Sequence, residues 1–318
     1  MPEDHASSHS DRNATHPDEI SNAGWWEVLK RVWQASSEKS LWVAAAGVAF
    51  FAFYALIPMF AVLVLVYGLF VGTETVQARM QELGSVLPEE AIKVLYNQLM
   101  ATARDTGASF GWGLAGSIMM LLWSLLFGMR ALMAGLNHAY HERETRGFLV
   151  LNGQALLLGC GALVLVIGSV GFLTMDVSIP GFDVAGPFWS AAIPITRWLL
   201  LTVVMVVSLT ICYRIGPCRA APKWRWVTWG GAAGTALWML ASLGFSFYVR
   251  HVATYETAYG VAGSVLTVMI WLYLVAYAVL AGAALNAEME RQTSRDTTVG
   301  AARPVGARGA RAADHKPE

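Results

Sequence analysis

Residues 261–287 read VAGSVLTVMIWLYLVAYAVLAGAALNA, a run without a single charged side chain. The hydrocarbon core of a bilayer is about 30 Å thick, and a helix needs roughly 20 apolar residues to cross it. A helix also satisfies its own backbone hydrogen bonds where no water is present. This stretch therefore predicts a transmembrane helix, against which the rest of the chain can be compared.

Long apolar runs of the same kind occur five more times along the chain. Four of them have uncharged cores, and the fifth carries only Arg197 near one end, from which its long side chain can reach the headgroups. The composition agrees with a membrane protein, since 56% of the 318 residues are hydrophobic and 14% are charged. We predict an all-α polytopic membrane protein with six transmembrane helices at about residues 41–72, 110–136, 148–175, 191–213, 227–249 and 261–287.

Lysine and arginine are distributed unevenly over the connections between these spans. They gather before residue 41, in the second and fourth connections and after residue 290, whereas residues 176–190 contain none. Because positively charged connections are retained in the cytoplasm, both the N and the C terminus are predicted to lie there. The first residues lack the pattern of a cleavable signal peptide, so the first span is expected to direct insertion into a bacterial inner membrane.

The segments that flank the spans differ in character. Residues 1–22 predict a disordered cytoplasmic tail, and residues 291–318 predict a disordered basic cytoplasmic tail that contacts anionic lipid. Aromatic and apolar residues recur at helical spacing within 25–33, which favours an interfacial N-terminal helix lying on the membrane. Residues 88–103 predict a periplasmic amphipathic helix. Residues 23–290 then form one six-helix integral membrane domain in the lipid bilayer.

Ionisable residues close to the membrane are costly and mark candidate sites. Arg130, Asn137 and His141 follow one another at steps of seven and four, so they share one stripe of a helix. Arg214 and Glu288 follow two other spans that are predicted to end on the same side. If these helices adjoin, the five residues form a ligand-binding site for an anion, because arginine matches phosphate and carboxylate. The alternative is that these side chains only reach the headgroups and fix helix packing.

Two further features concern the helices themselves. Pro58 lies near the middle of the first span and removes one backbone donor from it. We interpret it as a structural kink; a broken helix that lines a cavity is the alternative. Gly230 and Gly234 in the fifth span allow another helix to approach closely.

Residue patterns for enzyme chemistry are missing from the sequence. The seven histidines are scattered, and neither an H-x-H nor an HExxH pairing is present to hold a metal. The sequence also lacks a Walker loop, a Gly-x-Ser-x-Gly elbow and an aromatic and basic platform for RNA. We therefore expect no enzyme, no catalytic residue, no metal, no cofactor and no nucleic-acid partner.

Several separate motifs resemble the YihY/BrkB family of bacterial inner-membrane proteins over about residues 25–291. They are AGVAFFAFYALIP at 46–58, GMRALMAGLNHAY at 128–140, ETRGF at 144–148, YRIGP at 213–217, WRW at 224–226, YETAYG at 255–260 and LNAE at 285–288. The resemblance implies a six-helix membrane protein of unsettled biochemical role. It also implies two older labels, ribonuclease BN and serum-resistance virulence factor, of which the first conflicts with the residues present here.

Three functions follow from these patterns. The first is transport or handling of an anionic lipid or solute through a cytoplasm-open cavity, with anionic lipid headgroups as partners. The second is a non-catalytic scaffold that docks an envelope protein partner through residues 88–103 or residues 255–260. The third is the inherited ribonuclease label, which is disfavoured.

Overall fold

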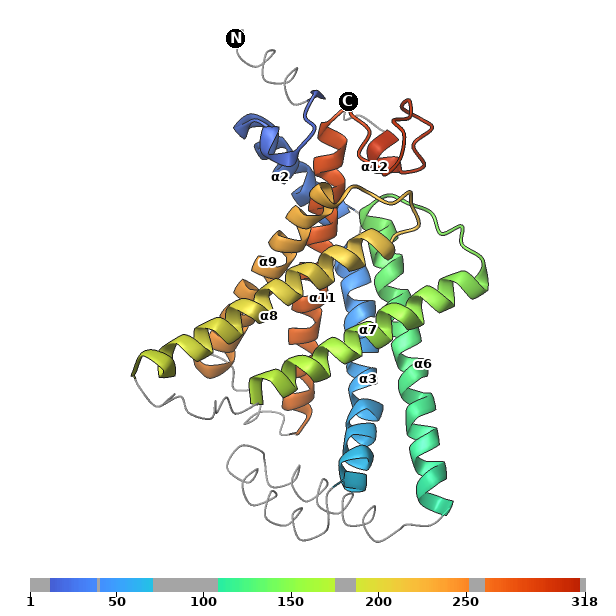
Figure 1. Cartoon of the computed structure of the whole chain (residues 1–318), viewed down its shortest axis with the longest axis vertical. Coiled ribbons are helices and arrows are strands. Elements are labelled where there is room, and N and C mark those ends of the chain that lie inside the picture. The colour runs from blue at the N-terminus through green and yellow to red at the C-terminus, as the bar shows by residue number, and fades with distance from the viewer. Residues whose placement is uncertain (1–11, 39–40, 71–107, 175–186, 252–260, 315–318) are drawn as a thin grey trace. The chain divides into compact units, whose positions relative to one another are not determined.

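The computed structural model describes residues 12–38, 41–70, 108–174, 187–251 and 261–314. Within this part of the chain, six helices are long and apolar enough to cross a membrane (Figure 1). Their membrane-capable stretches are Leu41–Met59, Gly111–Ala139, Phe148–Ser169, Ala192–Ile215, Trp224–Val249 and Val265–Gln292. The prediction of an all-α polytopic membrane protein with six transmembrane helices is confirmed.

The helices extend somewhat beyond these stretches, and shorter helices flank them. The long ones are α3 (Leu41–Phe70), α6 (Ala108–Ala139), α7 (Phe148–Thr174), α8 (Pro187–Ile215), α9 (Trp224–His251) and α11 (Val261–Gln292). The flanking ones are η1 (Pro17–Glu19), α2 (Asn22–Glu38) and α12 (Arg311–Asp314). The predicted helix at 88–103 and the scaffold surface at 255–260 lie outside the described residues.

The chain divides into two compact units, of which the larger comprises residues 1–50 and 128–318. Its central helix is α11, which packs most extensively on α9 and also contacts α2 and α12. Half of the membrane-capable stretch of α11 is buried by protein, compared with 11% in α7, α8 and α9. Helices α7, α8 and α9 therefore leave most of their apolar surface to lipid, whereas α11 forms the core of this unit.

Glycine allows α9 to approach α11 closely at Gly230 and a side chain of α8 at Gly234. A Cβ atom on Gly230 would lie 2.3 Å from the Asn286 side chain, and one on Gly234 would lie 2.7 Å from the Tyr213 hydroxyl. Asn286 Oδ1 accepts a hydrogen bond from the Gly230 amide (2.8 Å), and its Nδ2 donates to the carbonyl of Val227 (3.2 Å). The small residues predicted to permit close packing thus do so here.

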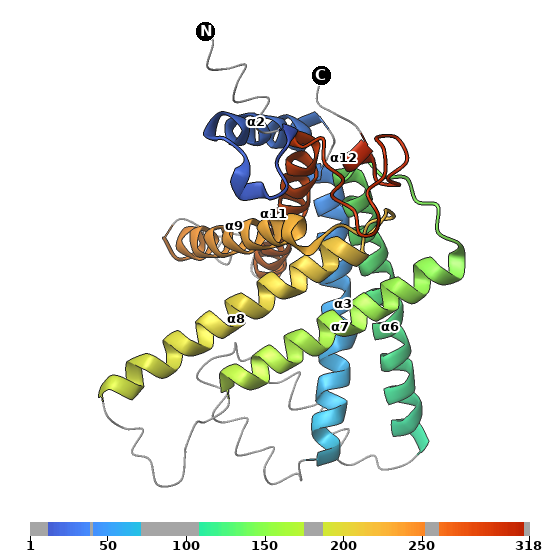
Figure 2. The same ribbon diagram turned by 45° about the horizontal axis from the view of Figure 1, so that its top comes forward.

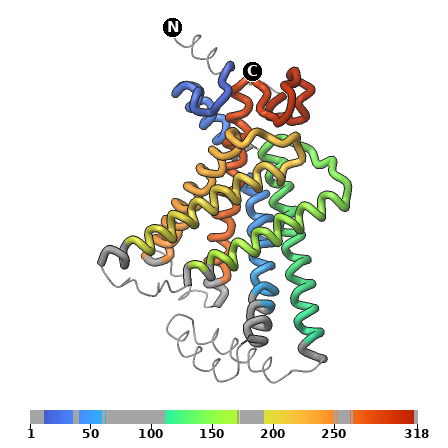
Figure 3. Tube along the Cα trace, viewed as in Figure 1, coloured from blue at the N-terminus to red at the C-terminus, as the bar shows by residue number. Residues whose placement is uncertain are grey.

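Four segments of the larger unit meet at the C-terminal end of α11 and form what we call the polar cap: residues 12–38, 140–147, 216–223 and 293–314. Figures 1 and 2 place α2 and α12 on different sides of this end of α11. The tube in Figure 3 follows the chain out of α11 and into the folded C-terminal segment. The cap is held by hydrogen bonds and ion pairs, and by a small apolar cluster of Ala14, Ile20, Val28, Trp226 and Met289.

The predicted disorder of the C-terminal tail is wrong for residues 293–314. Backbone hydrogen bonds join this segment to the α8–α9 connection, from Ala220 to Gly309 (2.9 Å) and from Lys223 to Thr297 (2.8 Å). The side chain of Arg308 is buried and donates to several backbone carbonyls of the segment. A polar composition therefore does not leave this segment without structure, because its polar groups bond to one another.

The described part of the N-terminal tail, residues 12–22, is also folded, contrary to the predicted disorder. Glu19 accepts hydrogen bonds from the backbone and hydroxyl of Thr15. Ala14 and Ile20 are buried, and the Thr293 hydroxyl donates to the Ala14 carbonyl at 2.7 Å. Residues 12–22 and the segment that follows α11 thus contact each other in the polar cap.

Helix α2 has two apolar faces where the sequence predicted one. Trp25 packs against Trp229 with ring centroids 5.6 Å apart, and Val28 is fully buried. Trp26 and Trp33 are instead exposed. The first face is covered by the protein, and the second remains for the predicted contact with the membrane interface.

The smaller unit comprises residues 51–127, of which the structure describes parts of α3 and α6. Aromatic rings connect these two helices: Phe51 stacks on Phe127 at 6.0 Å, and Tyr54 meets Trp123 edge-on at 5.9 Å. Pro58 lies inside α3, which continues on both sides of it. The kink expected at Pro58 stays a prediction.

Candidate functional site

Helix α6 ends in an unusual turn that positions His141. The amide of His141 donates to the carbonyl of His138 (3.1 Å), and the amide of Glu142 donates to that of Asn137 (2.7 Å). These are the two hydrogen bonds of a Schellman motif, whose left-handed residue is usually glycine. Here His141 takes that conformation with φ 61°. This position therefore carries an imidazole side chain, although its backbone conformation favours glycine.

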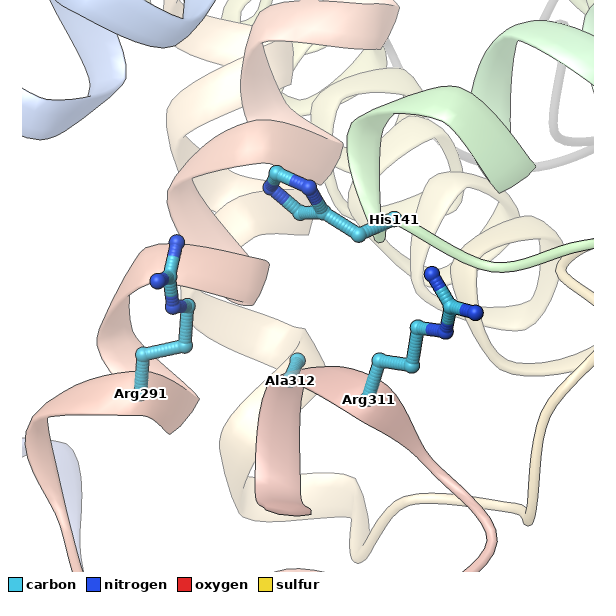
Figure 4. Close-up of a pocket in the computed structure, with 4 residues that line it drawn as sticks. All are labelled: His141, Arg291, Arg311 and Ala312. Atoms are coloured by element: carbon cyan, nitrogen blue, oxygen red, sulfur yellow. The ribbon is translucent and has the colours of Figure 1, made fainter. Parts of the chain in front are cut away.

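His141 lines a small cavity of about 140 Å³ together with Arg291, Arg311 and Ala312. We call it the arginine cavity. Figure 4 shows Arg291, from α11, and Arg311, from α12, on either side of Ala312, with the imidazole of His141 extending from the end of α6. Two segments of the polar cap and the last turn of α11 thus contribute nitrogen-bearing side chains to one opening.

Glu288 lies next to this cavity and is 2% exposed. Its carboxylate pairs with Arg31 Nε at 3.1 Å and with Arg291 Nη1 at 3.2 Å, and it lies 3.9 Å from Nε2 of His141. Arg31 also donates to the Gln292 side chain at 2.6 Å. One carboxylate thus faces two guanidinium groups, of which Arg31 also lies 3.9 Å from the carboxylate of Glu27.

Arg291 is incompletely satisfied within the protein. Its side chain is 25% exposed, yet its Nε atom is buried and has no hydrogen-bond partner among the described residues. Leaving a buried donor without an acceptor costs roughly 1–3 kcal/mol. An oxygen-rich ligand at the arginine cavity would offer acceptors to such a side chain.

Arg130 and Asn137 line a second, larger cavity, which we call the α6–α7 cavity. It measures about 360 Å³ and has a mixed lining of Arg130, Met133, Ala134, Asn137, His138, Glu142, Glu144 and Leu151. Asn137 also has a structural role, because its Nδ2 donates to Glu144 (2.9 Å) and its Oδ1 accepts from the Cys218 amide (2.6 Å).

Two carboxylates of the α6–α7 cavity have opposite pKa shifts. Hydrogen bonds from the Arg146 side chain lower the pKa of Glu144 to about 2, in spite of partial burial. Burial raises the pKa of Glu142, although the backbone amide of Arg311 donates to it at 2.7 Å. The lining of this cavity is therefore less uniformly cationic than that of the arginine cavity.

The predicted site residues fall in three places. His141 and Glu288 meet at the arginine cavity, and Arg130 and Asn137 line the α6–α7 cavity. Arg214 lies over the ring of Trp224, 4.2 Å from its centroid, and is not among the described residues that line either cavity.

Sequence reasoning missed the arginines that surround Glu288. Arg291 could have been found, since it follows Glu288 by three residues and therefore lies on the same face of the helix. Arg31 and Arg311 carry no such signal, because Arg31 is 257 positions away from Glu288 and Arg311 lies in a segment that was predicted to be disordered.

A fully buried ion pair was missed as well. Arg219 and Glu290 are both 0% exposed and form two hydrogen bonds, of 2.6 and 3.0 Å. The Thr297 hydroxyl donates to Glu290 at 2.7 Å, and Arg219 lies over the ring of Tyr140. Burial by itself would lower the pKa of Arg219, but attraction to Glu290 raises it.

These features define a polytopic α-helical membrane protein with a folded polar cap that contains a cationic cavity. In the part of the chain that the structure describes, no group of three histidine, cysteine or acidic residues could hold a metal ion. The chain belongs to the family described as virulence factor BrkB, whose family model matches residues 32–305.

Curated relatives agree with a membrane protein. The chain is 26% identical over 258 residues to the Bacillus subtilis (strain 168) protein YfkH, covering 78% of this chain and 90% of that protein. The name of YfkH includes the words ribonuclease-like, which is a legacy label. A UPF0761 membrane protein of Pseudoalteromonas translucida (strain TAC 125) is 24% identical over 86% of this chain and 88% of its own length.

Some relatives are longer than this chain. The UPF0761 membrane protein of Stenotrophomonas maltophilia (strain K279a) is 23% identical over 81% of this chain, which spans 59% of that protein. No solved structure gives a significant match.

Proposed function

We propose that this protein handles an anionic lipid or solute by binding its phosphate group at the arginine cavity. The observation that carries the proposal is the lining of the cavity by His141, Arg291 and Arg311 without any carboxylate among the described lining residues. Arginine offers several donors in a planar fork that matches the oxygens of a phosphate. The incompletely satisfied Arg291 favours a ligand that supplies acceptors.

A purely structural explanation accounts for part of this arrangement. Cations near helix C-termini offset the partial negative charge of the last carbonyls, and Arg291 lies in the last turn of α11. Arg31 and Arg291 also neutralise Glu288. Arg311 does not neutralise Glu288: it lies in α12, its backbone amide donates to Glu142 at 2.7 Å, and its positive charge partly offsets the rise that burial causes in the pKa of Glu142. The guanidinium of Arg311 nevertheless lines the cavity, which the neutralisation of Glu288 does not explain.

The protein is proposed to lie in the inner membrane with the polar cap in the cytoplasm. Lysine and arginine are concentrated in the segments that build this cap, as the positive-inside rule requires of cytoplasmic segments. This placement puts the arginine cavity next to the cytoplasmic leaflet, where lipid phosphates and soluble phosphates are both present. The binding chemistry is the same for either source.

Binding measurements on the purified protein in nanodiscs test the proposal. Inorganic phosphate is titrated into phosphatidylcholine nanodiscs, and nanodiscs containing phosphatidylglycerol show whether lipid competes for the site. Arg291→Gln and Arg311→Gln are each expected to weaken phosphate binding at least tenfold, which corresponds to about 1.4 kcal/mol. Arg303→Gln is the matched control, because Arg303 is exposed on the same segment and outside the cavity.

The result separates the possible sources of the ligand. Phosphate binding that phosphatidylglycerol abolishes identifies a lipid headgroup site, and binding that the lipid does not affect identifies a site for a soluble anion. Equal weakening by Arg303→Gln and Arg311→Gln would show a general charge effect and contradict the proposal. Movement of the bound compound is then measured in vesicles, with phosphatidylglycerol scrambling and phosphate uptake as the two readouts.

A further inference from the structure

One wall of the arginine cavity belongs to the C-terminal segment 293–314, and Arg308 holds this segment together. Its buried guanidinium donates to the carbonyls of Ala313 (2.7 Å) and Ser294 (2.7 Å) and also to those of Arg295 (3.2 Å) and Arg303 (3.1 Å). These four carbonyls lie at both ends and in the middle of the segment. A single side chain therefore fixes the path of the whole segment.

Most of the contacts between this segment and the rest of the larger unit are polar, although Ala312 also belongs to the apolar core. Besides the backbone hydrogen bonds to Ala220 and Lys223, the Arg311 amide donates to Glu142, and Thr297 donates to Glu290. The buried apolar side chains near its end are alanines, at positions 310, 312 and 313. An alanine side chain buries only one methyl group, so these residues add little hydrophobic stabilisation.

Such a segment is expected to open more readily than the helices it covers, because local stability follows the amount of buried apolar surface. Opening would carry Arg311 and Ala312 away from Arg291 and so dismantle the arginine cavity. The cavity exists only while the segment is closed. A ligand that contacts both Arg291 and Arg311 binds the closed form alone.

We propose that the segment 293–314 is a ligand-coupled wall: Arg308 keeps it closed, and a phosphate group bound between Arg291 and Arg311 stabilises the closed form. This inference rests on the proposed function, since it names the regulation of the same site. Coupling between the two events is reciprocal: bound phosphate opposes opening, and a variant in which the wall is open most of the time binds phosphate more weakly, in proportion to the fraction that remains closed. Arg308 is then a positioning residue that does not contact the ligand.

Hydrogen exchange measured by mass spectrometry tests the inference on the full-length protein in phosphatidylcholine nanodiscs. Inorganic phosphate at saturation is expected to slow exchange in residues 293–314 at least tenfold, while exchange in α9 stays unchanged. Arg308→Ala is expected to speed exchange in the segment and to weaken phosphate binding at least tenfold. Arg308→Lys is expected to give exchange rates and phosphate affinities between those of the wild type and of Arg308→Ala, because an ammonium group cannot reach all four carbonyls. Arg303→Ala is the matched control and should change neither quantity.

The outcomes separate this inference from the proposed function. If the wild-type protein binds phosphate but exchange in the segment does not respond, the coupling is refuted and the binding site stands. If Arg308→Ala leaves segment exchange unchanged, the positioning role of Arg308 is refuted. If the wild-type protein binds no phosphate, the proposed function and the coupling both fail. Unchanged exchange in α9 shows that each variant is folded. If Arg308→Ala speeds exchange in α9, the comparison is made with Arg308→Lys in its place.

Discussion

Glu288 and Glu290 lie two residues apart near the end of α11 and are both buried, but their partners differ. The carboxylate of Glu290 has hydrogen-bond partners for both of its oxygens: Arg219 binds each of them, and Thr297 adds a third hydrogen bond. The side chains of Arg219 and Glu290 are 0% exposed. Glu288 shares two arginines that are 20% and 25% exposed, and it adjoins a cavity.

The difference follows from helix geometry. With 3.6 residues per turn, two residues of separation place the two carboxylates on nearly opposite sides of α11. One side faces the α8–α9 connection, and the other faces α2 and the arginine cavity. The self-contained pair of Arg219 and Glu290 fixes the polar cap, whereas the two partly exposed arginines that share Glu288 leave donors for a ligand. We therefore assign stability mainly to Glu290 and ligand binding mainly to the surroundings of Glu288.

The largest effect is expected from Glu290→Gln. Removing one partner of a buried ion pair leaves the other charge without compensation and costs about 3–5 kcal/mol. The free energy of unfolding in bicelles, measured with denaturant, should fall by that amount. The double variant Arg219→Met/Glu290→Leu should recover most of the loss, because it removes both charges and retains packing.

Glu27→Gln provides the control for this measurement. Glu27 is 63% exposed and lies 3.9 Å from Arg31, so its removal should cost less than about 1 kcal/mol. If Glu290→Gln cost no more than this control, the assignment of stability to the buried pair would be wrong.

A smaller loss of stability is expected from Glu288→Gln, about 2 kcal/mol, because charged hydrogen bonds to partly exposed arginines are lost but no cation becomes fully buried and unpaired. Phosphate affinity is expected to rise severalfold, since a carboxylate that competes for Arg291 has become neutral. Unfolding and phosphate titration of the same preparation measure both quantities. Weaker phosphate binding would show that Glu288 orients the arginines. Glu288 and Glu290 would then both have a structural role and differ only in how much stability each provides.

The sequence was sufficient for the helices but not for the polar cap. Uncharged runs such as residues 261–287 indicate a membrane span directly, because every residue along them lies in an apolar environment, either lipid or packed protein. The pairing of Arg219 with Glu290 joins positions 71 residues apart and depends on the path of the connection between α8 and α9. Nothing in the local pattern encodes that path.

Composition misled the prediction of the C-terminal tail for a related reason. Arginine, threonine and glycine are typical of disordered segments, since they bury little apolar surface. In residues 293–314, Arg308 instead satisfies backbone carbonyls of its own segment, and Asp314 accepts from the amides of Gly306 (2.8 Å) and Arg308 (3.1 Å). This stabilisation comes from geometry, which composition does not report.

The smallest effect concerns Glu142 and Glu144, which repeat the contrast between incomplete and complete pairing on the α6–α7 connection. The pKa of Glu144 falls from its ordinary 4.5 to about 2 because Arg146 binds its charged form, so its stabilisation is present above pH 4.5 and is lost as pH falls toward 2. The pKa of Glu142 is raised by burial. Its contribution is therefore fully present below pH 4.5 and is lost as pH rises through the folded-state pKa.

The two neutral variants should consequently differ in sign. Glu144→Gln is expected to lower the melting temperature at pH 7 and to lose this effect progressively in acid. Glu142→Gln is expected to raise it slightly at pH 7 and to match the wild type below pH 4.5, since its amide oxygen still accepts from Arg311. Thermal unfolding of both variants between pH 3 and pH 8 gives the two slopes. Slopes of the same sign would mean that the Arg311 amide compensates for the burial of Glu142, and that its pairing is as complete as that of Glu144.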